Sequence, residues 1–253
     1  MPPNGADTAA PAAGFRPGWP APPGVRAWVS ERGGGVSVGR YAGLNLGTHV
    51  GDDPAAVAEN RRRLAAAAGL PAEPVWLEQV HGRRVLDLDA DERAPADGAV
   101  TGRRGVVCAV LTADCLPVLL CDRAGRRVGV AHAGWRGLLA GVLPAAVDAM
   151  GVPPDELLAW LGPAIGPDAF EVGEEVRAAY VAQDPAAASC FAPNARGRWQ
   201  ADLYELARQS LAGAGVTEIH GGGFCTYTER ERFFSHRREG PTGRFATLIW
   251  LEP

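Results

Sequence analysis

Lysine is missing from this sequence of 253 residues, and all 25 of its basic side chains are arginine. Arginine is suited to bidentate recognition of phosphate and carboxylate groups. In a chain without lysine, however, an arginine is a weaker sign of such recognition. The formal net charge is −4, whereas a nucleic-acid-binding protein usually carries a basic face or stripe. We therefore expect no nucleic acid partner, and an anionic substrate must meet a local cluster of arginines.

The sequence also lacks closely spaced cysteines and long apolar segments. The five cysteines are an odd number without a C-x-x-C pair, so we expect reduced thiols in a cytoplasmic protein. No apolar run approaches the ~20 residues that a membrane-spanning helix needs, and the first residues lack the pattern of a secretory signal. We expect a soluble protein without a membrane partner, and nothing in the sequence indicates its oligomeric state.

The order of apolar and polar segments predicts one domain. Residues 1–24 are rich in proline, alanine and glycine, so we predict a disordered tail there and a single catalytic domain over 25–253. Helices are predicted from Asp53-Pro54 to Gly69, over 138–150 and 174–182, and after the capping pair Asp202 and Glu205. Strands are predicted over 25–30, 75–77, 106–111, 118–120, 127–131, 158–161 and 246–251. Because strands and helices alternate, the fold class is α/β or α+β.

Three residues with metal-binding side chains follow apolar strands. His81, Cys115 and His132 each lie in a polar break behind such a strand, where rigid folds place functional groups. Histidine with cysteine suits zinc or copper, and three protein ligands would leave a fourth position open, as in catalytic zinc sites. Their spacings match no local metal signature, so the residues alone leave a second interpretation open: two hydrogen-bonded loop histidines and one buried thiol.

Several sequence blocks in a fixed order resemble a known family. The blocks are residues 45–52 (NLGTHVGD), 79–82 (QVHG), 112–117 (TADCLP), 132–137 (HAGWRG), 162–166 (GPAIG) and 233–238 (FFSHRR). Together they look like the YfiH-like family, also called the multicopper polyphenol oxidase or laccase-domain family. The resemblance covers roughly residues 25–252. Position 236 is histidine, where the family often has tyrosine.

The resemblance implies a fold, a metal site and an activity. The implied fold is a layered α-β-β-α sandwich. The family's metal ligands correspond to His81, Cys115 and His132, and the implied metal is Zn²⁺. The implied activity is phosphorolysis of purine nucleosides (adenosine, inosine, guanosine and methylthioadenosine) with deamination of adenosine. Purine nucleosides and phosphate are therefore the expected small-molecule partners.

That chemistry suggests roles for polar residues in the same blocks. The predicted catalytic residues are His49 and Asp114, as acid or base groups, and Arg136, which can bind phosphate through its forked donors. The residues predicted to bind substrate are Asn45, Gln79, Arg237 and Arg238. Each has a structural alternative: a loop brace, an orienting hydrogen bond, a helix cap or a surface ion pair.

Two other functions remain as hypotheses. A copper-dependent polyphenol oxidase is one, but multicopper sites need many imidazole ligands and the chain has only five histidines. The other is a non-enzymatic protein in which zinc joins loops. Structural zinc sites have four protein ligands, and Cys225 or His49 could supply the fourth.

Overall fold

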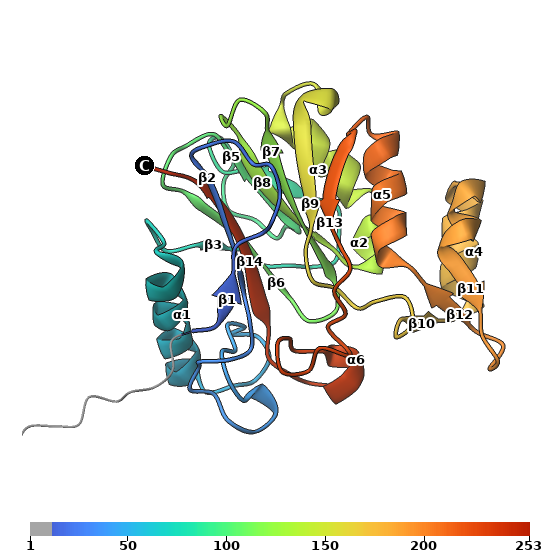
Figure 1. Ribbon diagram of the computed structural model, residues 1–253, viewed down its shortest axis with the longest axis horizontal. Helices are drawn as coiled ribbons and strands as arrows, with labels where there is room; N and C mark the ends of the chain where they lie inside the picture. Colours follow the sequence, from blue (N-terminus) through green and yellow to red (C-terminus); the bar gives the residue numbers. More distant parts are fainter. Residues whose placement is uncertain (1–11) are drawn as a thin grey trace, which may run out of the picture.

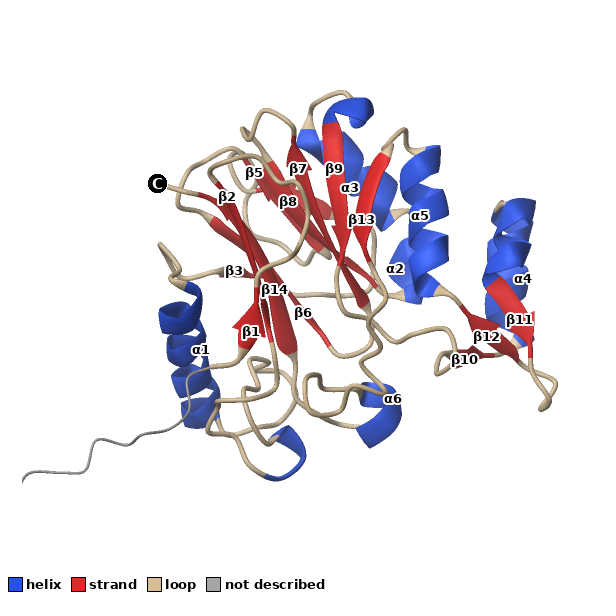
Figure 2. Ribbon diagram, viewed as in Figure 1, coloured by secondary structure: helices blue, strands red, loops and turns tan. Residues whose placement is uncertain are grey.

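Two β-sheets packed face to face form the centre of the molecule (Figures 1 and 2). A computed structural model of the chain describes residues 12–253. The first sheet has the strand order β1 (Gly14–Phe15), β2 (Val25–Ser30), β14 (Phe245–Leu251), β6 (Val107–Thr112) and β3 (Val75–Trp76). The second has the order β13 (Glu218–Gly221), β9 (Leu157–Leu161), β7 (Leu116–Asp122), β8 (Val128–Ala133), β5 (Gly98–Thr101) and β4 (Val85–Asp87).

The strands β6 of the first sheet and β7 of the second are apolar on both faces, which explains why each sheet is covered on both sides. In β6, Cys108 and Val110 point into the core between the sheets, while Val107 and Ala109 belong to the core on the outer face of the first sheet. A strand that is apolar throughout must be covered on both sides. The helix α1 (Pro54–Ala68) covers the first sheet, and α3 (Val142–Met150) and α5 (Leu203–Gly213) cover the second (Figure 1). The predicted α-β-β-α sandwich is confirmed.

Helix boundaries follow the expected caps with one exception. The Asp53 carboxylate accepts a hydrogen bond from the Ala55 amide at the start of α1, and Gly69 ends this helix in the left-handed conformation. The single helix predicted over 138–150 is wrong. It is divided into α2 (Trp135–Leu139) and α3, because Gly141 has a φ of 89° and interrupts the helical path.

A smaller unit projects beside the sandwich. It contains the sheet β10 (Glu171–Val172), β12 (Trp199–Ala201) and β11 (Phe191–Pro193), together with α4 (Glu174–Gln183). In Figure 2 this unit lies to the right of α5. The sequence predicted α4 but not the three short strands. A last helix, α6 (His236–Glu239), lies below the ends of the central strands.

The N-terminal segment differs from the prediction of a disordered tail over 1–24. Residues 1–11 lie outside the part that the structure describes. From Ala12 onward, however, the chain is packed against the sandwich: Gly14 and Phe15 form β1, which pairs with β2. The Phe15 and Trp19 side chains pack against the core between the sheets. Because these two aromatic residues lie in a segment rich in proline and alanine, its composition did not indicate that the segment is packed against the sandwich.

No helix among residues 12–253 has the length and apolar character that crossing a membrane requires.

Candidate metal centre and pocket

The three predicted metal ligands come together in the structure. Cys115 lies in the hairpin that joins β6 of the first sheet to β7 of the second, His132 lies in β8, and His81 lies in the loop after β3. One ligand atom of each residue lies within 4.8 Å of those of the other two. The Cys115 Sγ and His81 Nε2 atoms are 3.8 Å apart. These residues can therefore hold a metal ion, as the sequence suggested.

A buried carboxylate that the sequence analysis missed positions two of these ligands. Asp97 is fully buried, and its Oδ1 atom lies 2.8 Å from Nδ1 of His132. This contact leaves Nε2 of His132 available for a metal. The carboxylate also accepts hydrogen bonds from the amides of His81 and Gly82, at 2.9 and 2.6 Å. Asp97 thus fixes one histidine through its ring and the other through its backbone.

The turn that carries His81 has an unusual backbone. His81 has a φ of 59°, in the left-handed region that residues with a side chain seldom occupy. Its amide and the amide of Gly82 both point at the Asp97 carboxylate, which stabilises this conformation. The turn consequently directs the His81 imidazole toward Cys115. The Q-V-H-G sequence therefore forms a turn that orients His81 and also supplies this ligand.

The charges of the site favour the thiolate form of Cys115. Burial alone raises the pKa of the Cys115 thiol, but the adjacent His132 and His81 rings outweigh burial and lower this pKa to about 6. Burial alone lowers the pKa of His132, but Cys115 and Asp97 raise it to about 9. The pKa of Asp97 is lowered: burial opposes this shift, and the hydrogen bonds from His132 and Gly82 outweigh burial. The thiolate is the form that binds metal.

The donor set fits a zinc ion with one open position. Two imidazole nitrogens and one thiolate are ligands that zinc prefers. The three residues differ in their exposure to solvent. His132 is buried, Cys115 is half-buried and His81 is exposed. A metal held by these atoms would therefore face an open cavity on one side, as a catalytic site requires.

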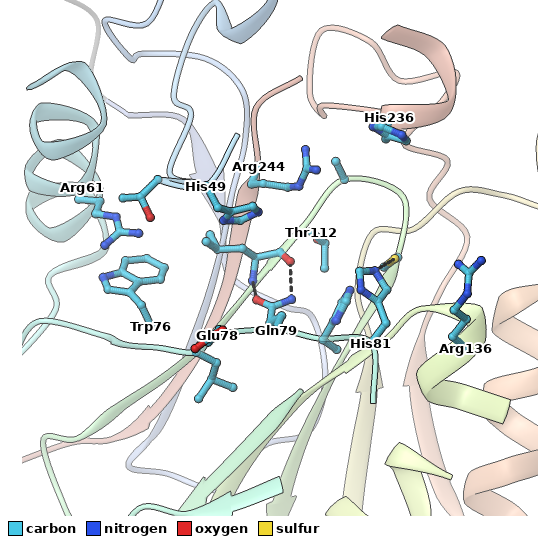
Figure 3. Close-up of a pocket in the computed structure, with 16 residues that line it drawn as sticks. His49, Arg61, Trp76, Glu78, Gln79, His81, Thr112, Arg136, His236 and Arg244 are labelled. Carbon is cyan, nitrogen blue, oxygen red and sulfur yellow. Dashed lines mark hydrogen bonds between the residues drawn. The ribbon is translucent and has the colours of Figure 1, made fainter. Parts of the chain in front are cut away.

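That cavity has a volume of about 730 Å³. It is lined by residues from β3, β6 and β8, from the loops beside them, and from α1, α2 and α6: Thr48, His49, Arg61, Trp76, Leu77, Glu78, Gln79, His81, Leu111, Thr112, Ala113, Cys115, His132, Arg136, His236 and Arg244. Figure 3 shows Arg136 on one side of His81, and His49, Arg244 and Arg61 on the other. Positive side chains thus flank the candidate metal centre from both sides.

Some of the predicted catalytic and substrate-binding residues lie in this cavity. His49 and Arg136 line it, and both are exposed to solvent. Gln79 lines it too, but its amide group accepts from the Leu111 amide and donates to the Leu111 carbonyl, at 2.8 and 2.9 Å. Gln79 therefore braces the strand β6 at the cavity wall, and its capacity for binding substrate is largely used.

The structure places two predicted residues in structural roles instead. Asn45 is fully buried, and its side chain bonds to Asp52, Gly47 and the amide of Arg244. Asp114 is nearly buried with a φ of 89°. Its carboxylate accepts from the Thr226 hydroxyl and the Arg237 amide, at 2.6 and 2.7 Å. Both polar groups have hydrogen-bond partners inside the protein, and the substrate contact of Asn45 and the acid or base role of Asp114 stay predictions.

The paired arginines of α6 are also outside the cavity. Arg238 bonds to Glu239 and to the carbonyls of Phe233 and Tyr227. Arg237 donates to the Glu171 carbonyl and lines a separate surface hollow beside the small sheet. Neither arginine lines the cavity beside the candidate metal ligands, and their role as phosphate ligands stays a prediction. Their helix contributes His236 to the cavity instead.

The sequence analysis missed several polar residues of the site. Arg61 lies within α1 and reaches the cavity beside Trp76, and Arg244 precedes β14. In a chain whose only basic residue besides histidine is arginine, neither stood out. Asp97 could have been suspected, because it is a carboxylate directly before an apolar strand.

Comparison with known proteins agrees with this architecture. Residues 26–252 match the family described as multi-copper polyphenol oxidoreductase laccase. The chain therefore belongs to this laccase-domain, or YfiH-like, family.

Particular relatives are close. The chain is 58% identical over 237 residues to a purine nucleoside phosphorylase of Pseudomonas aeruginosa, and the match covers 93% of this chain and 97% of that protein. It is 56% identical over 237 residues to the purine nucleoside phosphorylase YfiH of Escherichia coli, with the same coverage of both chains. The crystal structure of protein NMB0706 from Neisseria meningitidis has a TM-score of 0.90 at 50% identity, covering 95% of this chain and 99% of that one.

Proposed function

We propose that this chain is a zinc-dependent purine nucleoside phosphorylase that also deaminates adenosine. Adenosine, inosine, guanosine and methylthioadenosine are the proposed nucleosides, and phosphate is the second substrate. The observation that carries the proposal is one cavity in which a His-Cys-His group, able to hold a metal, lies between positively charged walls. The names of the two bacterial relatives support the same activity.

The size and lining of the cavity suit these substrates. Ligand pockets for small molecules have volumes of about 300–1,000 Å³, and about 730 Å³ is enough for a nucleoside together with phosphate. Leu77, Leu111 and Ala113 provide apolar surface for a purine ring. The domain proposed for catalysis is 25–253, to which residues 12–24 add an edge strand. We propose a cytoplasmic location, where the five free thiols stay reduced.

Phosphorolysis is a balanced exchange of two bonds at the ribose. A phosphate oxygen bonds to C1′ while the bond from C1′ to the purine nitrogen breaks, and the electron pair leaves with the base. The proton of hydrogen phosphate ends on the base, so the products are ribose 1-phosphate and the free purine. The protein must hold phosphate close to C1′ and exclude other orientations, which positively charged walls can do.

Deamination converts adenosine and water into inosine and ammonia. When bound, zinc supplies a Lewis acid and activates water near neutral pH. Among the lining residues, His49 is suited to accept a proton. Its pKa is lowered from the ordinary value, first by its partial burial and then by the charges of Arg244 and Arg61, which favours the neutral ring that can accept a proton.

A direct experiment joins metal content to turnover. We expect about one zinc per chain, release of free base and ribose 1-phosphate from inosine with phosphate, and conversion of adenosine to inosine. Cys115→Ala and His81→Ala should lose both reactions and the metal. Matched controls are Cys225→Ala and His220→Ala, whose side chains do not line the cavity and should leave both reactions intact.

The same measurement separates the other hypotheses. Copper in the purified protein, with oxidation of a diphenol by oxygen and no turnover of nucleosides, would establish the polyphenol oxidase. The geometry speaks against a multicopper centre, because within residues 12–253 the only cluster of three or more metal-binding side chains is His81, Cys115 and His132. Zinc that is bound without any turnover would leave the non-enzymatic hypothesis.

A further inference from the structure

The cavity contains three positively charged or titratable side chains on the side away from Arg136. They are Arg61 from α1 and Arg244 before β14, which we refer to as the cationic wall, and His49 from the loop before this helix. Figure 3 shows His49 beside Arg244, with Arg61 on the other side of His49. We propose that the cationic wall is the binding subsite for the phosphate oxygens, a proposal that rests on the proposed function.

The two arginines of the cationic wall have no acidic partner. Within residues 12–253, no carboxylate oxygen lies within 4.0 Å of the Arg61 or Arg244 guanidinium, although arginines elsewhere pair with Asp or Glu. Both side chains are half-buried, and burial is the main reason that the pKa of each is lowered. A partly buried cation without a counter-ion is stabilised by binding an anion.

Hydrogen bonds fix the two guanidinium groups and leave donors unused. The Nε and Nη2 atoms of Arg61 donate to the Leu46 carbonyl, at 3.1 and 2.9 Å, and its group lies 4.1 Å from the centre of the Trp76 ring. The Nη1 atom of Arg244 donates to the Thr242 and Gly243 carbonyls, at 2.9 and 3.0 Å. Nη1 of Arg61, and Nε and Nη2 of Arg244, have no such bond to the described residues and can donate to a ligand.

The loop that carries His49 is held by the same two arginines. The Leu46 amide donates to the Arg244 carbonyl at 3.0 Å, and the Leu46 carbonyl accepts from Arg61. The exposed Thr48 adds a hydroxyl to the lining at this point. The loop, α1 and the residue before β14 are therefore one rigid support. Such a support keeps the donors in place before phosphate binds, which lowers the entropy cost of binding.

Other charges in the cavity agree with this placement. Glu78 is the only acidic residue of the lining. In Figure 3 it lies on the opposite side of the Gln79–Leu111 hydrogen bonds from Arg244. Arg136 is the rival phosphate ligand, but it is exposed and its guanidinium lies 4.2 Å from the centre of the adjacent Trp135 ring. The cationic wall offers two half-buried guanidinium groups, whereas Arg136 on the opposite side is a single exposed one.

The test compares Arg244→Gln and Arg61→Gln with Arg62→Gln. Arg62 is the neighbour of Arg61 in α1 but is exposed and pairs with Glu59, so it is a matched control. The first measurement is calorimetric titration of inorganic phosphate into the zinc-loaded protein without nucleoside. We expect the first two variants to weaken phosphate binding by about ten- to a hundredfold, as for the loss of a hydrogen bond to a charged group. Arg62→Gln should bind as wild type.

The second measurement separates this proposal from the proposed function. The KM for phosphate in inosine phosphorolysis should rise in Arg244→Gln and in Arg61→Gln, whereas the KM for inosine should stay close to that of wild type, and Arg62→Gln should change neither value. Unchanged phosphate binding in both wall variants, or a rise in KM caused by Arg136→Gln alone, overturns the phosphate subsite. If no nucleoside is cleaved by wild type but the wall variants still lose phosphate binding, the proposed function fails and the subsite stands.

Loss of folding is controlled separately. Thermal unfolding of each variant is recorded first, because Arg61 and Arg244 both support the loop. If Arg244→Gln does not fold, Arg244→Lys takes its place, because lysine retains the charge but lacks the forked donors. We expect its affinity for phosphate to lie between that of wild type and that of Arg61→Gln. If Arg244→Lys and Arg61→Gln both fold and both bind phosphate with the affinity of wild type, the proposal is contradicted.

Discussion

At the scale of single residues, the Asp97 carboxylate has the widest influence on the candidate metal centre. It contacts the ring of His132 and the backbone amide of His81, and so connects two of the three candidate ligands. Residues that orient metal ligands in this way affect metal affinity without touching the ion. The effect of Asp97 on the site should therefore be measurable as a change of affinity.

We expect Asp97→Asn to weaken zinc binding by about 10–100-fold, as is usual for residues that orient a metal ligand. The amide cannot replace a charged acceptor for the His81 turn and for His132 at once. Competition with a chromogenic chelator measures the affinity. Asp122→Asn is the matched control: this carboxylate is also buried and accepts the amides of Arg126 and Arg127, so its loss should lower stability and leave zinc affinity unchanged. Equal zinc affinity in wild type and Asp97→Asn would contradict this role.

The titration of His49 gives a second residue-scale prediction. Burial, Arg244 and Arg61 lower its pKa below the ordinary value of 6.5. The folded state therefore binds this proton less tightly than the unfolded state, and His49 makes stability fall as pH decreases from 6.5 through the lowered pKa. NMR titration should give a His49 pKa below 6.5 in wild type and a higher value in Arg244→Gln. The same pKa in both proteins would show that Arg244 does not act on His49.

The residue scale also shows what the sequence could and could not predict. His81, Cys115 and His132 were predicted as a group by family resemblance, since their separation along the chain carries no local signature. Asn45 and Asp114 lie in the same resembling blocks, yet both are buried and hydrogen-bonded inside the protein. A sequence block shows that a position matters, but only the fold separates a residue that faces the cavity from one that supports it.

At the scale of elements, the start of α2 lies against the candidate ligands. A side-chain carbon added to Gly134 would lie 2.8 Å from the Cys115 Sγ atom and 3.2 Å from Cδ2 of His81. The backbone of Gly134 has a φ of −64°, which any residue can adopt. The glycine is therefore needed for close packing and not for its conformation.

Gly134→Ala should consequently reduce metal content while the helices and sheets remain intact. The added methyl group displaces Cys115 or His81, and the backbone itself is not strained. Metal analysis and circular dichroism of the purified variant measure the two effects. In Gly213→Ala, where the added carbon meets no atom within 4 Å, metal content should match wild type. A fully metal-loaded Gly134→Ala would show that the ligands can move without loss of binding.

Element prediction succeeded where local chemistry decides the structure. The capping residue Asp53 and the terminal Gly69 of α1, and the uniformly apolar β6 and β7, were readable from the chain. The strands of the small sheet are two or three residues long and pair with partners distant in sequence. Such short strands have no periodic pattern to detect, and only tertiary contacts define them.

At the scale of the whole molecule, the three candidate ligands lie outside the hydrophobic cores. The three hydrophobic cores extend through all four layers, whereas the His-Cys-His group lies at one end of the sandwich. A metal at this position adds stability by binding only the folded state, but it is not required for the cores to form.

Removal of the metal by a chelator should therefore lower the melting temperature without unfolding the protein. Saturation at 100 times the Kd adds about 2.7 kcal/mol to the free energy of unfolding. Far-ultraviolet circular dichroism should be the same before and after chelation, and re-addition of zinc should restore the melting temperature. Unfolding on chelation would instead support the hypothesis in which zinc only joins loops.

The connection between the two sheets has a consequence for protein design. The connection from β6 to β7 that carries Cys115 crosses from one sheet to the other, whereas His132 lies in β8 of the second sheet, Asp97 directly precedes β5, and His81 lies in the loop after β3. The shortest continuous segment that contains all four residues would lack β14, the strand that is hydrogen-bonded to β6. Transplanting this centre into another scaffold therefore requires both sheets, and a short grafted peptide would not reproduce it.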